Sequence, residues 1–164
     1  MSRERITHMK REDFITRMRA DREAFAALWH GLTDQQMTQR PGPQEDWSVK
    51  DLIAHITWYE QYIAQRIEAL LAGEDHPPLG DFDAVNAVIF EENKDRPLAD
   101  VLAEFDASPA RVEKAVLALN EAQFNEGGAY TVDGVTVLQY AIGSTFGHLN
   151  DHIADLRRHV DGLR

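Results

Sequence analysis

The amino-acid sequence of 164 residues predicts an all-α fold, a four-helix bundle in up-down-down-up order. Four long segments repeat apolar residues at intervals of three and four, which is the period of a helix that buries one face. Proline and glycine interrupt this pattern between the segments. The connection from Ala72 to Arg96, between the second and third segments, has about 25 residues and is long enough to cross the bundle. The second and third helices should therefore run parallel.

The first helix is expected from about Lys10 to Leu32. Its apolar face consists of residues that recur mostly at helical spacing, namely Phe14, Met18, Phe25, Leu28, Trp29 and Leu32. Gly31 is suited to end this helix, and Thr33 with Gln36 can cap a short further turn. The sequence RPGP that follows breaks the helical pattern.

The second helix is expected over about Val49–Leu71. Ser48 is a suitable N-cap, and Asp51 three residues later completes a capping box. Gly73 suits the left-handed conformation that follows a helix. His55 lies at the edge of the apolar stripe, which consists of Leu52, Ile56, Tyr59 and Ile63. We therefore expect the His55 side chain to face a groove and not bulk water.

A short helix over Asp81–Asn93 is expected within the long connection, because apolar residues recur at helical spacing there as well. The third bundle helix should begin at Pro97, since the first position of a helix tolerates proline, and should continue to Leu119. Ser108-Pro109 is expected to kink this helix or to split it in two.

The segment before the last helix has the composition of a small hairpin. Two short runs rich in β-branched residues flank Asp133-Gly134, a dipeptide that favours a tight turn. The last helix should then extend from about Thr136 to Asp161. It is expected to bury one apolar stripe, which consists of Leu138, Ile142, Leu149, Ile153, Leu156 and Val160.

The composition favours one domain over residues 1–164, because 43% of the residues are hydrophobic and no long proline- or glycine-rich linker divides the chain. There is no run of about 18 apolar residues, and the N-terminal sequence MSRERITHMKRED is charged where a signal peptide is apolar. We therefore expect a cytoplasmic protein without membrane contact. The formal charge of -11 and the lack of a basic stripe argue against nucleic acid as a partner.

The chain contains no cysteine. This excludes a disulfide framework, a thiolate metal ligand and a cysteine nucleophile. Any thiol chemistry must therefore use a thiol that a substrate supplies.

Three histidines form a candidate metal site. His148 and His152 are four residues apart, so both imidazoles lie on one face of the last helix and can share a cation. This spacing alone is weak evidence, because about 0.3 such pairs arise by chance in a chain with 7 histidines. Histidines that face solvent or are hydrogen-bonded are the plain alternative. In the expected topology, however, His55 and His152 both lie roughly 10 to 14 Å from the same end of the bundle. The three side chains can then bind one divalent ion, zinc or nickel first, with iron or manganese as alternatives.

Several neighbours of these histidines are candidates for a pocket or for supporting roles. A substrate pocket beside His55 is expected to be walled by Trp58, Tyr59 and Tyr62, with Arg66 further along, unless these aromatic residues belong to the core. Asp151 and Asp155 are expected either to orient an imidazole or to face water. The other histidines are assigned to the surface, at His8, His30 and His76, or to the negative pole of the last helix, at His159.

Two stretches, WSVKDLIAHI and GHLNDHIADLRRH, resemble the DinB-like superfamily of four-helix bundles, and the order of elements is similar over nearly the whole chain. In that superfamily one histidine of the second helix and an H-x-x-x-H pair of the fourth bind a divalent metal. The resemblance assigns these ligands to His55, His148 and His152. The start of the family's second helix is matched by Trp47, Ser48 and Asp51. The same segment is similar to the branch that includes colibactin self-protection proteins, some of which act without a metal triad.

The resemblance implies a metal-dependent enzyme, because several relatives are transferases or isomerases that use a low-molecular-weight thiol. For this chain we expect a thiol transferase or a hydrolase that acts on an electrophilic small molecule. Two alternatives stay open. One is a non-catalytic stress-response or small-molecule-binding bundle with a structural metal, and the other is a metal-independent self-protection hydrolase. The resemblance also implies a homodimer.

Overall fold

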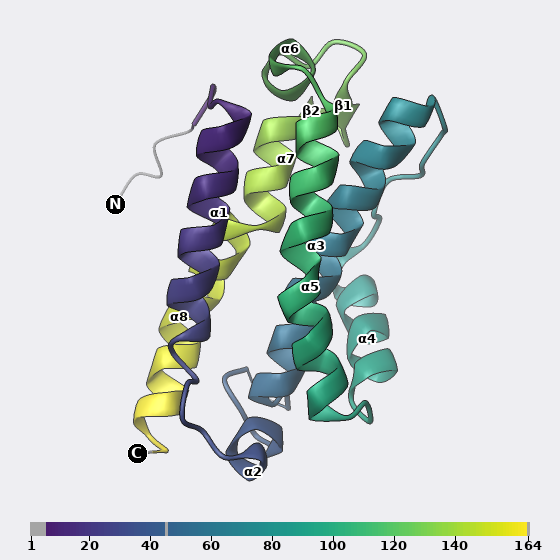
Figure 1. Cartoon of the computed structure of the whole chain (residues 1–164). Helices are drawn as coiled ribbons and strands as arrows, with labels where there is room; N and C mark the ends of the chain where they lie inside the picture. Colours follow the sequence, from purple (N-terminus) through teal and green to yellow (C-terminus); the bar gives the residue numbers. More distant parts are fainter. Residues whose placement is uncertain (1–5, 45, 164) are drawn as a thin grey trace.

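Four long helical arms lie side by side in the structure, which is a computed structural model that describes residues 6–44 and 46–163 (Figure 1). The arms are α1 (Arg11–Ala26), α3 (Val49–Ala72), α5 (Leu98–Ala118), and a fourth made of α7 (Val137–Ser144) and α8 (Phe146–Asp161). In Figure 1, α3 and α5 both run upward, whereas α1 and the fourth arm run downward. The expected up-down-down-up bundle is thus confirmed. Within the described ranges, no helix is long and apolar enough to cross a membrane.

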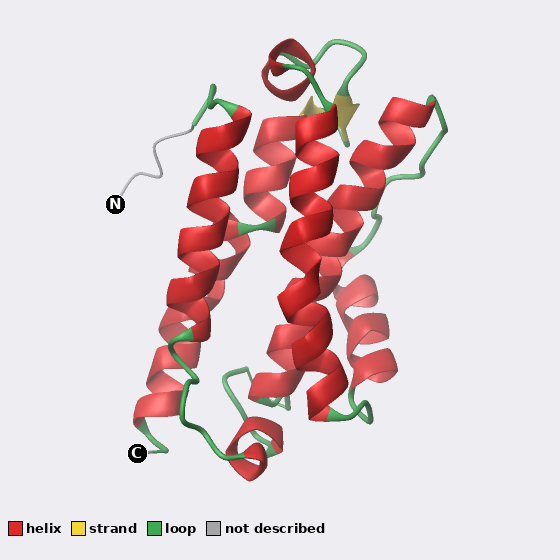
Figure 2. Cartoon of the chain, viewed as in Figure 1, coloured by secondary structure: helices red, strands yellow, loops and turns green. Residues whose placement is uncertain are grey.

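Shorter elements close the two ends of the bundle (Figure 2). At the lower end lies α2 (Asp34–Thr38), while α4 (Phe82–Asn93) packs outside α3, and the upper end carries α6 (Glu121–Asn125) and a hairpin of β1 (Thr131–Val132) and β2 (Val135–Thr136). Asp133 and Gly134 have φ angles of 49° and 82°, which is the backbone of a tight hairpin turn. The expected hairpin and the short helix in the long connection are confirmed, whereas α6 was not predicted.

The first arm is shorter than predicted. It ends at Ala26 and not near Leu32, because the backbone beyond it tightens into turns in which Leu28 N–H donates to Phe25 O and Trp29 N–H to Ala26 O. These turns keep residues three apart on one side of the chain, so the apolar spacing persists where the α-helix has ended. Gly31 follows with a φ angle of 88°.

Pro109 does not split α5, which is one helix from Leu98 to Ala118. A proline in a helix leaves the carbonyl four residues earlier without its usual donor. Here that carbonyl belongs to Phe105, and it accepts instead from the Arg22 guanidinium and lies 3.1 Å from the Ser108 hydroxyl. Of the two predicted outcomes, a kink or a split, the split is therefore wrong, because two side chains replace the missing N–H.

The expectation of one continuous last helix is also wrong. It breaks at Thr145, which has φ -123° and ψ -115° and separates α7 from α8. The break brings Gly147 against the end of α7, where a Cβ on residue 147 would lie 2.6 Å from the Ile142 carbonyl oxygen. The packing of Gly147 against α7 therefore bears on the position of α8 and of His148, the next residue.

The interior consists of two apolar clusters with a polar layer between them. The upper cluster is centred on Phe14, Met18, Ile63, Val112, Phe124 and Leu138, and the lower one on Phe25, Leu52, Ile56, Val101, Phe105 and Leu149. Between them, α1, α3 and α5 each contribute one buried polar side chain, Arg22, Glu60 and Ser108 respectively. The histidine cluster described below borders the lower apolar cluster.

Candidate metal centre

A double capping interaction fixes the helix that carries His55. The Ser48 hydroxyl accepts from Asp51 N–H, and Asp51 Oδ2 accepts in return from Ser48 N–H at 2.9 Å. Arg40 Nε also donates to Asp51 Oδ2 at 2.9 Å, which ties the preceding loop to the same carboxylate. The predicted capping box is confirmed, and it places His55 two turns into α3.

Three imidazoles converge at the level where α3 meets α8. His55 Nε2 lies 2.9 Å from His148 Nε2, and His152 Nε2 lies 3.0 Å from the same atom. One nitrogen from each of the three side chains lies within 4.8 Å of the others. His148 Nε2 carries either one proton or one lone pair, so it cannot satisfy both neighbours with good hydrogen bonds.

A metal ion fits this arrangement. A divalent ion with bonds of about 2.0 to 2.1 Å to imidazole holds its nitrogen ligands about 2.9 to 3.4 Å apart, from octahedral to tetrahedral angles. The two short Nε2 to Nε2 distances lie at the lower end of that range. The cluster could therefore hold one ion, and nothing in these distances selects among zinc, nickel, iron and manganese.

The environment keeps the imidazoles neutral. Burial lowers the pKa of His55 to about 2, with a further contribution from the positive charge that His148 and His152 would carry. Burial also lowers the pKa of His148 to about 3, with His152 as the second cause. The pKa of His152 is lowered by burial as well, although Asp151 and Asp155 oppose this shift. Neutral imidazole is the form that binds metal.

The second nitrogen of each ring has a different environment. Gln44 Nε2 lies 2.8 Å from His152 Nδ1. A rotation of this amide by 180° would bring its oxygen to the same place, where it would accept Nδ1–H and leave Nε2 of His152 for a metal. The Nδ1 atoms of His55 and His148 are buried without a hydrogen-bond partner in the described part of the chain. Gln44 was not predicted, because a glutamine in a proline-rich loop gives no spacing signal.

Aromatic rings surround the cluster on the α3 side. The rings of Trp47 and Tyr59 each lie edge-on to His55 at 5.0 Å between centroids, and Tyr59 also contacts His148 at 4.8 Å. Two residues of α4 hold these rings in place. Phe90 stacks on Trp47 at 6.0 Å, and Asn86 Oδ1 accepts from the Tyr59 hydroxyl at 3.0 Å. No feature of the sequence pattern indicated that α4 would reach this site.

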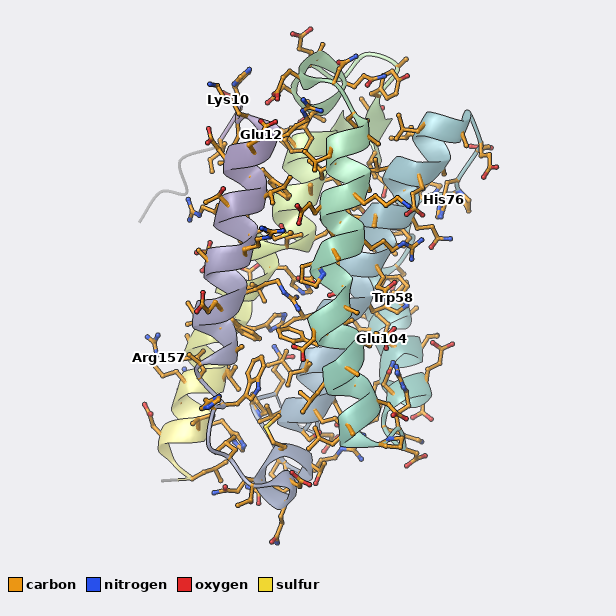
Figure 3. The ribbon with its side chains drawn as sticks, in the orientation of Figure 1. Lys10, Glu12, Trp58, His76, Glu104 and Arg157 are labelled. Carbon is orange, nitrogen blue, oxygen red and sulfur yellow. The ribbon has the colours of Figure 1, made fainter. Side chains whose placement is uncertain are left out.

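The three candidate pocket residues do not share one environment. Tyr59 borders the histidines, whereas the ring of Trp58 stacks on Tyr62 and lies near Glu104, where α3, α4 and α5 meet (Figure 3). Arg66 lies higher on α3 and binds Asp133 and the His76 backbone, both at 2.7 Å. The assignment of a substrate pocket to Trp58, Tyr59 and Tyr62 stays a prediction.

The remaining residues named from the sequence take mixed positions. His8 and His30 are exposed, as expected, but His76 is half-buried against Arg66. His159 has its Nε2 buried without a described partner, so the pole of the helix does not fully account for it. Asp155 pairs with Arg158 at 3.0 Å, and the charges of Asp151 and Asp155 both act to raise the pKa of His152.

Comparison with solved structures shows the same fold in proteins of very different sequence. A crystal structure of a protein from Streptococcus pneumoniae matches with a TM-score of 0.80 at 11% identity, over 93% of this chain and 91% of that chain. An uncharacterised protein from Escherichia coli UTI89 matches with a TM-score of 0.75 at 12% identity, over 93% and 94%. One from Clostridium difficile 630 matches with a TM-score of 0.75 at 10% identity, over 92% and 95%. A comparison with curated proteins gives no match. The family model of the DinB superfamily matches residues 17–156.

Proposed function

The chain belongs to the DinB superfamily, and on that basis we propose that it binds one divalent metal ion through His55, His148 and His152 and uses it in catalysis. The observation that carries this proposal is the convergence of three neutral imidazole nitrogens at one point. Three protein ligands leave coordination positions for water or substrate, which is the pattern of catalytic sites and not of closed structural ones.

The proposed reaction is the attack of a small thiol or of water on an electrophilic small molecule. When bound, a divalent ion would lower the pKa of a coordinated water or thiol and so supply the nucleophile near neutral pH. The thiol comes from outside, because the chain has no cysteine. This makes a thiol transferase or a hydrolase the preferred class.

The protein's own side chains would position the ligands and shape the site. Gln44 orients His152, and the capping box at Ser48 sets the height of His55 on α3. Burial raises the pKa of Tyr59, and the nearby Tyr62 contributes to the same shift. The Tyr59 hydroxyl therefore stays protonated and serves as a hydrogen-bond donor. His148 is the least buried of the three histidines, and we therefore place the approach of substrate on its side.

Metal content tests the first half of the proposal. Protein purified without a histidine tag should contain about one divalent ion per chain by elemental mass spectrometry. His148→Ala should lower this content sharply, and the double variant His55→Ala, His148→Ala should abolish it. His30→Ala is the matched control, because this exposed histidine lies outside the cluster and its loss should leave the metal content unchanged. Stoichiometric metal in the double variant would refute the site.

Turnover tests the second half. Low-molecular-weight thiols and water would be assayed against generic electrophiles with metal-loaded and chelated protein side by side. The proposal expects activity in the loaded form, its loss on chelation and its return when metal is added. Equal turnover in both forms would favour a metal-independent hydrolase instead. Metal binding without turnover on any pair would favour a bundle in which the metal is structural.

A further inference from the structure

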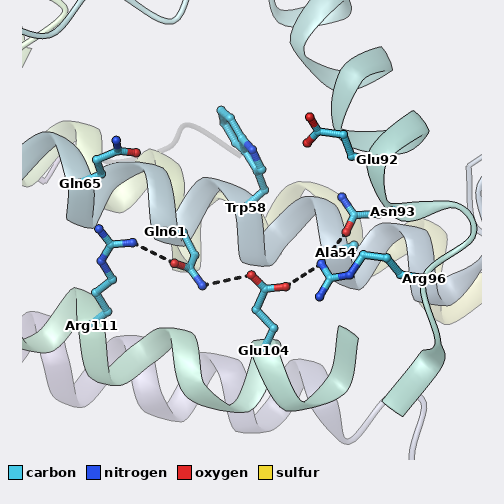
Figure 4. A pocket seen from close by; sticks show the side chains of 9 residues that line it. All are labelled: Ala54, Trp58, Gln61, Gln65, Glu92, Asn93, Arg96, Glu104 and Arg111. Atoms are coloured by element: carbon cyan, nitrogen blue, oxygen red, sulfur yellow. Dashed lines mark hydrogen bonds and ion pairs between the residues drawn. The ribbon is translucent and has the colours of Figure 1, made fainter. Parts of the chain in front are cut away.

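A hollow lies on a different face of α3 from the histidines, where α3, α4 and α5 meet (Figure 4). We call it the α3–α4 groove. Its volume is about 300 Å³, which suits a small molecule. Trp58 of α3, Glu92 near the end of α4, and Glu104 and Arg111 of α5 are among the side chains that line it. No part of the proposed metal chemistry uses this groove.

The positive charges of the groove are already neutralised. Arg96 pairs with Glu104 at 2.7 Å, and Arg111 pairs with Glu68 at 2.6 Å. Gln61 joins the two pairs, because it accepts from Arg111 at 3.0 Å and donates to Glu104 at 3.4 Å. An anion would have to break these ion pairs and approach one further carboxylate, that of Glu92. The groove therefore does not suit a negatively charged ligand.

One carboxylate that lines the groove, that of Glu92, has no charged partner among the described residues. Within the described residues, no hydrogen bond or ion pair engages the Glu92 carboxylate, whereas the adjacent Glu91 pairs with Lys94 at 2.6 Å. Glu92 also lies in the last turn of α4, which contains no basic residue. The Glu92 carboxylate therefore lies at the negative pole of α4. A nearby cation would be stabilised by this carboxylate and by the helix dipole.

Trp58 supplies the second recognition element. One face of its indole stacks on Tyr62, with 5.1 Å between centroids and 10° between planes. In Figure 4 the ring projects into the same space as Glu92, which comes from the other wall of the groove. The face of an indole attracts ammonium groups, and quaternary ammonium ions in particular. A half-buried indole opposite an unpaired carboxylate is thus suited to a cation with apolar substituents.

We propose that the α3–α4 groove binds a small organic cation, an alkylammonium or quaternary ammonium ion, with its apolar groups on Trp58 and its charge near Glu92. The net charge of -11 raises the local concentration of such cations around the protein. Glu92 alone would attract any small counter-ion. The apolar contact with Trp58 distinguishes the proposed site from such binding.

The probe for this proposal is choline, and its uncharged isostere dimethylbutanol is the control for shape. Binding would be followed by proton–nitrogen NMR on the indole N–H signal of Trp58, identified by its absence in Trp58→Phe. Choline should shift this signal saturably, and the isostere should bind at least about tenfold more weakly. Glu92→Gln should weaken choline binding by a similar factor, whereas Glu91→Gln should leave it unchanged.

Each alternative result would overturn the proposal. If the signal does not saturate below about 100 mM choline, the groove does not bind the cation. If sodium chloride at equal ionic strength reproduces the shift, the effect is one of general screening. Equal binding of choline and its isostere would remove the role of charge, and equal weakening by Glu91→Gln and Glu92→Gln would remove the role of this carboxylate. Thermal melts of the two variants, both at exposed positions, check that the fold is intact.

Discussion

Replacement of Arg22 by methionine should be among the most damaging single changes in this protein. Arg22 Nη1 donates to both carboxylate oxygens of Glu60, and its second terminal nitrogen donates to the Phe105 carbonyl. Arg22 is 5% exposed and Glu60 is fully buried. The guanidinium carbon also lies 3.7 Å from the centroid of the Phe105 ring. One side chain therefore serves three partners in the layer between the two apolar clusters.

The expected loss of stability follows from the groups that Arg22→Met leaves without a partner. Glu60 would remain buried with only the Ser108 hydroxyl, 2.5 Å away, as a partner. Breaking a buried ion pair by removing one member costs about 3 to 5 kcal/mol, because the other charge stays unpaired. Phe105 O would also lose a donor. Replacing both charges, in Arg22→Met with Glu60→Leu, should recover most of this loss, because the desolvation of the carboxylate disappears with it.

The pH dependence of this loss of stability is a sharper test than its size at a single pH. Burial raises the pKa of Glu60, and Arg22 and Ser108 oppose that shift. Without Arg22 the pKa of Glu60 should rise further. A carboxyl with a raised pKa in the folded state holds a proton that the unfolded chain releases, so stability falls as pH rises above about 4.5. The loss caused by Arg22→Met should therefore be smaller at pH 5 than at pH 8.

Urea unfolding followed by circular dichroism at both pH values measures these free energies. Arg19→Met is the matched control, because Arg19 also joins α1 to α5, through Glu113, but is 62% exposed. Its loss should cost less than about 1 kcal/mol. The reasoning fails if Arg22→Met and Arg19→Met cost the same, or if the double variant is no more stable than Arg22→Met alone.

Two further predictions concern the metal centre. Ser48→Ala should cost about 1 kcal/mol through the lost cap and should also weaken metal binding, and unchanged melts with unchanged metal affinity would contradict the positioning role of this cap. In the metal-free protein, His55 and His148 stay neutral at pH values where the unfolded chain takes up protons, below about 6.5. The two neutral imidazoles therefore cost no stability above that pH. On acidification toward pH 3, the free energy of unfolding falls by up to about 1.4 kcal/mol for each of these groups per pH unit. Unfolding curves between pH 7 and 5 should show this slope, and the double variant His55→Phe, His148→Phe should flatten it.

The features that could be predicted from the sequence are those with local chemical causes. Ser48 and Gly73 mark both ends of α3, and the connection from Ala72 to Arg96 is long enough to cross the bundle, which favours parallel α3 and α5. Because that topology could be inferred, the meeting of His55 with the pair on the last helix could be inferred too. The small hairpin was predictable from a local cause too, since Asp-Gly is a dipeptide that favours the positive φ angles of this turn.

The sequence contains a signal for the polar layer of Arg22, Glu60 and Ser108. Arg22 stands four residues after Met18 and three before Phe25, on the apolar stripe and not on the polar face of α1. Glu60 and Ser108 interrupt the stripes of α3 and α5 in the same way. Opposite charges on apolar stripes, at heights that the topology brings together, predict a buried pair.

Other features depend on contacts between distant parts of the chain, and no local sequence pattern predicts them. Pro109 indicated a kink or a break in α5, and the sequence around it did not show that Arg22 would arrive from α1 to join Ser108 as a donor to the Phe105 carbonyl. Gln44 meets His152 across 108 positions of sequence. Likewise, α4 supports the aromatic wall of the metal centre through Asn86 and Phe90, although its own pattern indicates only a short amphipathic helix.

The break at Thr145 is the feature with the most direct consequence for the site, and two glycines test it. A Cβ on residue 147 would lie 2.6 Å from the Ile142 carbonyl oxygen, a backbone atom that cannot move without shifting α7, whereas a Cβ on residue 143 meets nothing within 4 Å. Gly147→Ala should therefore cost about 1 to 3 kcal/mol and displace His148, the next residue, so that metal affinity falls as well. Gly143→Ala should be neutral or stabilise the protein by up to about 1 kcal/mol, because alanine reduces the conformational freedom of the unfolded chain. Thermal melts and metal titrations of both variants decide the matter: if they behave alike, close packing across the break does not position the histidines of α8.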